Sequence, residues 1–108
     1  MKKFLVTGAA GFIGSNVLRN LLNLNYDAYG LDNYGFSSTS NSNDLKERII
    51  QFDLNDKDNI AKHITDYENI IHLAGVDDRN YFRKNFYSSN DINIQCTINI
   101  IEQLNENQ

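Results

Sequence analysis

Near the start of the chain stands the stretch Thr7-Gly8-Ala9-Ala10-Gly11-Phe12-Ile13-Gly14. An apolar run, Phe4-Leu5-Val6, precedes it, and a segment follows in which Ile13, Val17 and Leu21 share one helical face. The order is therefore strand, glycine turn, helix. Three spaced glycines are weak evidence alone, but in this context they predict a turn that cradles the phosphates of a dinucleotide.

Each glycine of this turn has its own expected role. Gly8 can leave the strand sharply because glycine tolerates positive φ. Gly11 lets a pyrophosphate approach the backbone, and Gly14 lets the helix pack closely on the strand. The N-terminus of the helix then offers unpaired N–H groups and a partial positive charge to the phosphates.

The next apolar run, Tyr26 to Leu31, ends at Asp32. Asp32 lies 18 residues after Gly14, close to the separation of about 20 residues at which a carboxylate binds the adenosine ribose. A carboxylate there would accept hydrogen bonds from the ribose hydroxyls and would repel a 2′-phosphate. The sequence therefore predicts that NAD is preferred over NADP.

Four further motifs follow along the chain, namely Asp32-Asn33, Asp53-Leu54, His72-Leu73-Ala74-Gly75 and Asn93-Ile94-Gln95-Cys96-Thr97. Together with the glycine turn, and in the same order, they resemble the motifs of the extended short-chain dehydrogenase/reductase family. The closest resemblance is to its NAD-dependent nucleotide-sugar epimerases and dehydratases, and it covers nearly the whole chain. Cys96 is a departure, because it stands where the family usually has glycine.

The resemblance implies an α/β fold with a truncated, Rossmann-type, doubly wound parallel sheet of strand order 3-2-1-4. It implies a single NAD(P)-binding domain over residues 1–108. In the family the Asp53-Leu54 pair would approach the adenine, and the backbone of the fourth strand would lie along the cofactor. The residues expected to contact NAD are Gly8, Gly11, Phe12, Ile13, Gly14, Asp32, Asn33, Asp53, Leu54, Leu73, Ala74, Gly75 and Asn93.

The catalytic motif of the family, Tyr-x-x-x-Lys, occurs nowhere in this sequence. In the family the tyrosine is the acid/base on the sugar hydroxyl, while the lysine lowers the tyrosine's pKa and binds the nicotinamide ribose. We therefore expect no catalytic residue among these residues and no turnover by this chain alone. The catalytic groups are expected beyond Gln108, and a nucleotide sugar is expected to bind only together with that missing part.

Three functions stay open at this point, and whether the chain is an enzyme stays open with them. It can be the cofactor-binding part of an epimerase/dehydratase-like enzyme, a non-catalytic NAD-sensing or protein-interaction module, or a structural remnant with a degraded site. A neighbouring reading frame that supplies Tyr-x-x-x-Lys would favour the first. Tight NAD binding without such a partner would favour the second, and no binding would favour the third.

Composition argues against several other classes. A net charge of −4 makes a broad nucleic-acid footprint unexpected, and the apolar runs are too short to span a bilayer. The one cysteine allows no internal disulfide, and Cys96 is expected to be a small buried apolar residue. His63 and His72 have no metal-site spacing. The chain start lacks a convincing cleavage site for a signal peptide, and a cytoplasmic location is expected.

Residue patterns predict strands at about 3–7, 27–32, 49–53 and 69–74. They predict helices at 12–24 and 56–65 and a long helical segment to about 105. Residues 92–100 are ambiguous, since isoleucines alternate as in a strand but also fit a helical face; the resemblance favours helix. The loop from Tyr34 to Asn43 is rich in Gly, Ser and Asn, and reads equally as a solvated linker or as a cofactor contact.

The fourth strand is expected to leave an open, apolar edge, because the family's fifth strand would pair there. Unpaired backbone groups at such an edge invite another strand or chain. We expect a homo-oligomer, formed either at this edge as a symmetric dimer or by a swap of the C-terminal segment.

Overall fold

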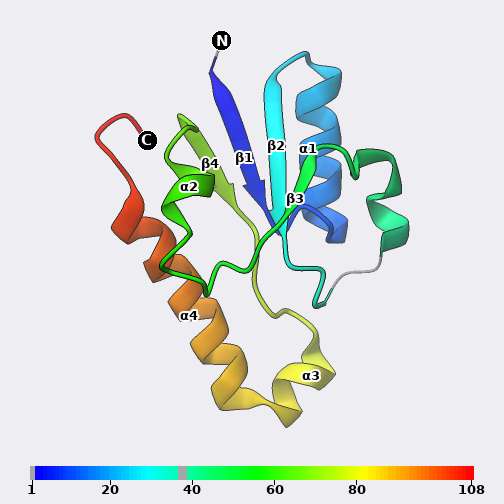
Figure 1. Cartoon of the computed structure of the whole chain (residues 1–108). Helices are drawn as coiled ribbons and strands as arrows, with labels where there is room; N and C mark the ends of the chain where they lie inside the picture. Colours follow the sequence, from blue (N-terminus) through cyan, green and yellow to red (C-terminus); the bar gives the residue numbers. More distant parts are fainter. Residues whose placement is uncertain (1, 37–38) are drawn as a thin grey trace.

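The structure, a computed structural model, describes residues 2–36 and 39–108. Its centre is a parallel sheet with helices packed on both faces (Figure 1). The sheet has the order β3-β2-β1-β4, and each neighbouring pair is parallel. Its strands are β1 (Lys3–Thr7), β2 (Asp27–Asp32), β3 (Ile49–Gln51) and β4 (Asn69–His72). The α/β class and the strand order 3-2-1-4 expected from the sequence are confirmed.

The helices are α1 (Phe12–Asn23), α2 (Ala61–Ile64), α3 (Arg79–Lys84) and α4 (Phe86–Gln103). Between β2 and β3, the loop carries two 3₁₀ turns, Thr39–Asn41 and Asn43–Leu45. The part of the predicted loop at 37–38 lies outside the described residues. No helix of the described ranges is both long and apolar enough to cross a membrane.

Side chains alternate across the sheet and bury both of its faces. Val6, Ala28 and Leu18 belong to the core under α1, while Leu5 and Leu31 belong to the core under α2 and α4. Both Leu5 and Val6 are fully buried. This explains why β1 reads as a continuous apolar run, as expected of a central parallel strand.

Several element boundaries differ from the sequence-based expectation. The predicted helix 56–65 shrinks to α2 because the residues before it form turns, with Asp56 N–H donating to Asp53 C=O and the Asn59 amide donating to the Asp56 carboxylate. The predicted strands 49–53 and 69–74 end earlier, at Gln51 and His72.

The predicted long C-terminal segment is two helices, because Asn85 leaves the helical region at φ −130°, ψ 47°. Residues 92–100 lie wholly inside α4, so the helical reading of the ambiguous segment is confirmed. Tertiary packing therefore outweighs the period-two pattern of isoleucines: Cys96 and Ile100, one helical turn apart, are buried in the core.

Candidate functional site

A cleft of about 420 Å³ opens at the carboxyl ends of the strands, a size typical of small-molecule sites. Ligands of open α/β sheets bind at this edge. Twelve of the thirteen residues predicted to contact a cofactor line it, which are Gly8, Gly11, Phe12, Ile13, Gly14, Asp32, Asn33, Asp53, Leu54, Leu73, Ala74 and Gly75. The structure thus brings these residues together, and their contact with a cofactor stays a prediction.

The glycine turn is shaped by two close backbone approaches. Gly8 has φ +69°, and a Cβ on it would lie 2.8 Å from the Ala74 nitrogen. A Cβ on Gly14 would lie only 2.0 Å from the Gly8 carbonyl oxygen. The turn is closed by a hydrogen bond from Gly11 N–H to Gly8 C=O at 3.1 Å. Gly8 and Gly14 are therefore required by the fold itself.

Gly11 differs, since its φ of −74° and ψ of 172° suit any residue. It is the N-cap of α1 and makes no side-chain capping bond. The N–H groups of the next three residues, Phe12 to Gly14, donate to no acceptor within the described residues. All three residues line the cleft. A bare backbone at Gly11 beside three free donors at a helix N-terminus is a suitable cradle for phosphate.

Asp32 joins the end of β2 to the glycine turn and is only 8% exposed. Its Oδ2 accepts a hydrogen bond from Ala10 N–H at 2.9 Å, and its Oδ1 accepts one from Tyr34 N–H at 2.7 Å. A carboxylate has about four acceptor positions, so capacity remains for hydroxyl groups in the cleft. Tyr34 holds a left-handed φ of +62°, and burial together with the Asp32 charge raises the pKa of its phenol.

A polar chain ties the turn to β4 and α4. Thr7 Oγ1 accepts hydrogen bonds from Leu73 N–H at 3.0 Å and Ala74 N–H at 3.1 Å and lies 2.6 Å from His72 Nδ1. Because both lone pairs of the hydroxyl are taken, its proton points to Nδ1. The proton of neutral His72 is thereby assigned to Nε2, which lies 3.1 Å from Thr97 Oγ1. Burial lowers the pKa of His72, in agreement with a neutral ring.

Asn93 lies outside the cleft lining. Its Oδ1 accepts from Val76 N–H at 2.5 Å and its Nδ2 donates to Val76 C=O at 3.1 Å. The amide also closes on Gly75, where a Cβ would lie 3.0 Å from Asn93 Oδ1. In the structure Asn93 therefore positions the backbone after β4, and direct contact with a cofactor stays a prediction.

The segment after β3 and helix α4 pack against each other beside the cleft. Asn99, almost fully buried, donates from Nδ2 to Leu54 C=O at 2.7 Å. Cys96 lines the cleft and packs in the core, as expected of a small apolar residue. Burial raises the pKa of its thiol to about 11, so the neutral thiol is strongly favoured.

Sequence reasoning missed several lining residues, which are Leu31, Phe36, Asn41, Phe52, Asn55, Asp77, Ile92 and Cys96. Asp77 carried a usable signal, because it follows the fourth predicted strand at the edge where parallel sheets bind ligands. Phe36 gave none: it reaches the cleft from a loop and contacts the Tyr81 ring of α3, with ring centroids 4.9 Å apart. Nothing local in the sequence joins these two segments.

Comparisons with known proteins agree with this geometry. The model of the NAD-dependent epimerase/dehydratase family matches residues 4–108. The chain is 40% identical over 104 residues to a putative UDP-glucose 4-epimerase of Methanocaldococcus jannaschii, a match that covers 93% of this chain and 33% of that protein. It is 36% identical over 80 residues to the UDP-glucose 4-epimerase of Bacillus subtilis, covering 67% and 24% respectively. The chain thus spans at most about a third of the length of these curated relatives.

Solved structures share the fold. The UDP-glucose 4-epimerase of Bifidobacterium longum, in complex with NAD⁺ and UDP, superimposes with a TM-score of 0.82 at 26% identity, over 94% of this chain and 32% of that one. The Thermus thermophilus enzyme, in complex with NAD, gives 0.81 at 25% identity, over 94% and 33%. Because the family model matches almost the whole of this chain, residues 4–108, the chain belongs to the NAD-dependent epimerase/dehydratase family.

Proposed function

We propose that the cleft binds NAD and that this chain supplies the cofactor-binding part of an epimerase/dehydratase-type site. One observation carries the proposal: the unpaired N–H groups of Phe12, Ile13 and Gly14 line the cleft beside the side-chain-free Gly11. Solved relatives with bound NAD support the choice of ligand. Bound NAD would supply a hydride acceptor at its nicotinamide ring.

The residues present fit this ligand. The helix N-terminus would hold the pyrophosphate, and the remaining acceptor capacity of Asp32 would hold the adenosine ribose. A 2′-phosphate would meet the Asp32 carboxylate without a compensating cation, because no Lys, Arg or His is found among the cleft-lining residues of the described ranges. We infer that NAD is preferred over NADP for this reason.

The proposal is tested by calorimetric titration of the purified chain with NAD and with NADP. We expect saturable NAD binding, weaker NADP binding, and a smaller difference in Asp32→Ala. Asp27→Ala, which removes a carboxylate at the opposite end of β2, is the matched control. If neither nucleotide binds, the proposed function is wrong. If Asp32→Ala still binds NAD with an unchanged NAD-to-NADP ratio, Asp32 is not the ribose ligand.

We infer that these residues alone do not catalyse hydride exchange with a sugar hydroxyl. Its sequence contains no Tyr-x-x-x-Lys, and a positioned acid/base is needed for hydride exchange with an alcohol. The relatives named as UDP-glucose 4-epimerases make a nucleotide sugar the proposed substrate class of a completed site. The cytoplasmic location stays a prediction that cell fractionation would check.

We also propose that the chain forms a homo-oligomer through the β4 edge and the neighbouring face of α4. β4 pairs only with β1 among the described strands, and Figure 1 shows it at the side of the sheet next to α4. Ile94, Ile98 and Ile101 share one face of α4 and are 58%, 40% and 60% exposed. Light scattering should report a dimer at micromolar concentration, and Ile98→Lys should shift it toward monomer; a strictly monomeric wild type would contradict the proposal.

A further inference from the structure

Three carboxylates line the cleft, and they are not equivalent. Asp32 accepts two backbone N–H groups, and Asp53 Oδ1 accepts Asn55 N–H at 2.9 Å. Asp77 makes no hydrogen bond or ion pair with any of the described residues, whose two ion pairs are Arg19–Asp44 and Arg48–Asp27. Asp77 is also exposed. It therefore brings an uncompensated negative charge to the cleft.

The backbone that carries Asp77 is held in place on both sides. Val76, only 3% exposed, has its N–H and C=O bound by the Asn93 amide. The following residue, Asp78, is the N-cap of α3 and accepts Tyr81 N–H at 2.7 Å. The backbone of Asp77 is thus held in one position at the edge of the cleft.

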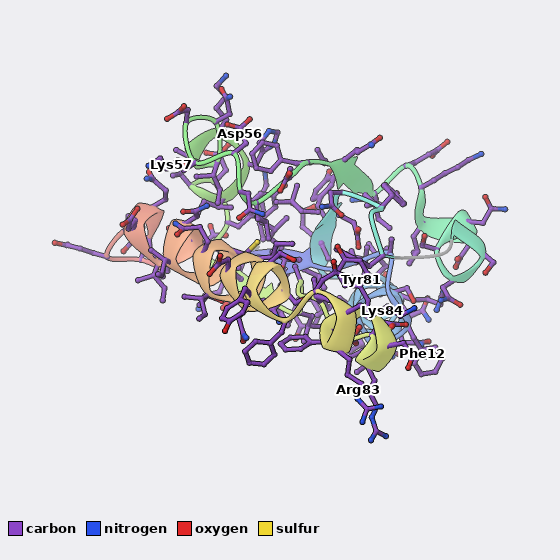
Figure 2. All side chains as sticks on the ribbon, turned by 90° about the horizontal axis from the view of Figure 1, so that it is seen from below. Phe12, Asp56, Lys57, Tyr81, Arg83 and Lys84 are labelled. Carbon is purple, nitrogen blue, oxygen red and sulfur yellow. The ribbon has the colours of Figure 1, made fainter. Side chains whose placement is uncertain are left out.

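The cations of α3 form no ion pair with Asp77 in the described ranges. Arg79 and Lys84 form no ion pair among the described residues, and Figure 2 shows the Arg83 side chain leaving α3 away from the body of the molecule. No positive side chain lines the cleft in the described ranges. A charged ligand group near Asp77 therefore interacts with a carboxylate that no ion pair of the described residues neutralises.

The topology says which half of a dinucleotide lies near Asp77. In folds of this kind the pyrophosphate sits over the glycine turn after β1, and the two nucleotide halves extend to either side. Asp32, at the end of β2, marks the adenosine side. Asp77 follows β4, which lies on the other side of β1 in the order β3-β2-β1-β4. The nicotinamide half therefore extends toward Asp77.

We propose that Asp77 makes this cleft select the oxidised cofactor, NAD⁺, over NADH. The inference rests on the proposed function. The two forms differ by one positive charge on the nicotinamide ring, so a carboxylate on that side of the cleft stabilises NAD⁺ and gives no such stabilisation to NADH. Adenosine and pyrophosphate contacts are the same for both forms and cancel in the ratio of their affinities.

The experiment is a pair of titrations of the full chain, with NAD⁺ and with NADH, on wild type, Asp77→Asn and the control Asp66→Asn. Asp66 is exposed and precedes β4, at the end of the strand opposite the cleft. We expect tighter binding of NAD⁺ by wild type and a fall in its preference of roughly three- to tenfold in Asp77→Asn, the scale of one screened charge. Asp66→Asn should retain the wild-type ratio, and the effect of Asp77→Asn should shrink at 1 M salt.

Asp77→Lys extends the test, because reversing the charge should lower the preference for NAD⁺ further than neutralising it. If both forms bind but Asp77→Asn and Asp77→Lys keep the wild-type ratio, the inference is wrong while the proposed function stands. An equal change in Asp66→Asn would also overturn it, since only the net charge of the chain would then matter. Binding of neither form would remove the proposed function and this inference with it.

Discussion

The side-chain amide of Asn93 binds both backbone polar groups of Val76, at 2.5 Å and 3.1 Å. This pair joins α4 to the segment that follows β4 and thereby fixes Gly75 at the edge of the cleft. A side chain predicted as a cofactor ligand is in this structure a support for the backbone that lines the site. Asn93 therefore supports the backbone that lines the cleft, and its direct contact with a cofactor stays a prediction.

Asn93→Leu should destabilise the fold by about 1–3 kcal/mol, because two partly buried backbone groups lose their partners. Urea denaturation measures the loss, and NAD titration should show weaker binding as the backbone after Gly75 loosens. Asn90→Ala is the control, since its amide only donates back to Phe86 C=O within the same helix. Equal losses in both variants would contradict the special role of Asn93.

Substitutions at Gly11 and Gly14 should separate binding from folding. Gly11→Val should fold, because φ −74° and ψ 172° are extended backbone that valine adopts readily. It should lose most of its NAD affinity, since the branched side chain would occupy the phosphate position. Thermal melting and calorimetry check both parts, and unchanged affinity would refute the placement of the phosphates.

Gly14→Ala should instead lower stability itself. Its Cβ would lie 2.0 Å from the Gly8 carbonyl oxygen, so α1 and the glycine turn must move apart. We expect the free energy of unfolding to fall by about 1–3 kcal/mol. The melting temperature should therefore fall below that of Gly11→Val. A Gly14→Ala protein as stable as wild type would show that the helix packs less closely on the turn than described.

Stability should rise with pH below about 6.5, the ordinary pKa of histidine, because burial lowers the pKa of His72 in the folded state. Between the folded-state and unfolded-state pKa values of His72, the unfolded chain binds more protons than the folded chain. The contribution of neutral His72 to stability is therefore lost as the pH falls, and it is fully present above the unfolded-state pKa. Protonated Nδ1 would also point its proton at Thr7 Oγ1, whose lone pairs are taken by Leu73 and Ala74.

Urea denaturation of wild type and His72→Gln between pH 5 and 8 tests this dependence. The slope in this window should be smaller in His72→Gln, which cannot titrate there. Parallel curves for wild type and His72→Gln would show that His72 is not the responsible group.

The Cys96 thiol should react slowly with alkylating agents. A pKa raised from 9.0 to about 11 lowers the thiolate fraction near neutral pH by roughly 100-fold relative to an ordinary thiol. Iodoacetamide labelling followed by mass spectrometry should therefore be slow in the folded chain and fast in urea. Equal rates in the two states would mean that the core around Cys96 opens readily.

Local patterns predicted most of the sheet. Sequence patterns predict the apolar runs of β1 and β2 and the glycine turn, because each of these features depends on residues within a few positions of one another. The helix that contains α2 was predicted, but its late start at Ala61 was missed, because the Asn59 amide binds the Asp56 carboxylate in a turn that competes with the helix. The break at Asn85 was missed as well.

The site was predicted where a motif is continuous in sequence and missed where it is assembled by distant segments. Asp32 and the glycine turn, which line the cleft, were predicted from their spacing together with the strand–turn–helix order around them. Phe36 depends on its contact with Tyr81 of α3, and the Thr7–His72–Thr97 chain depends on the meeting of β1, β4 and α4; no short pattern encodes either. The role of Asn93 was read from a motif, and only the packing of α4 reveals that its amide binds Val76.

The hydroxyl of Thr7 joins residues 66 and 67 positions further along the chain, and this has a consequence for the order of folding. Closing so long a loop costs entropy before any contact compensates it, and non-local strand pairs form late for that reason. β1 and β2 can pair early, whereas the support of Gly8 waits for β4. We expect the glycine turn after β1 to be among the last parts to become ordered during folding. Nucleotide binding would then begin only after β4 has paired with β1.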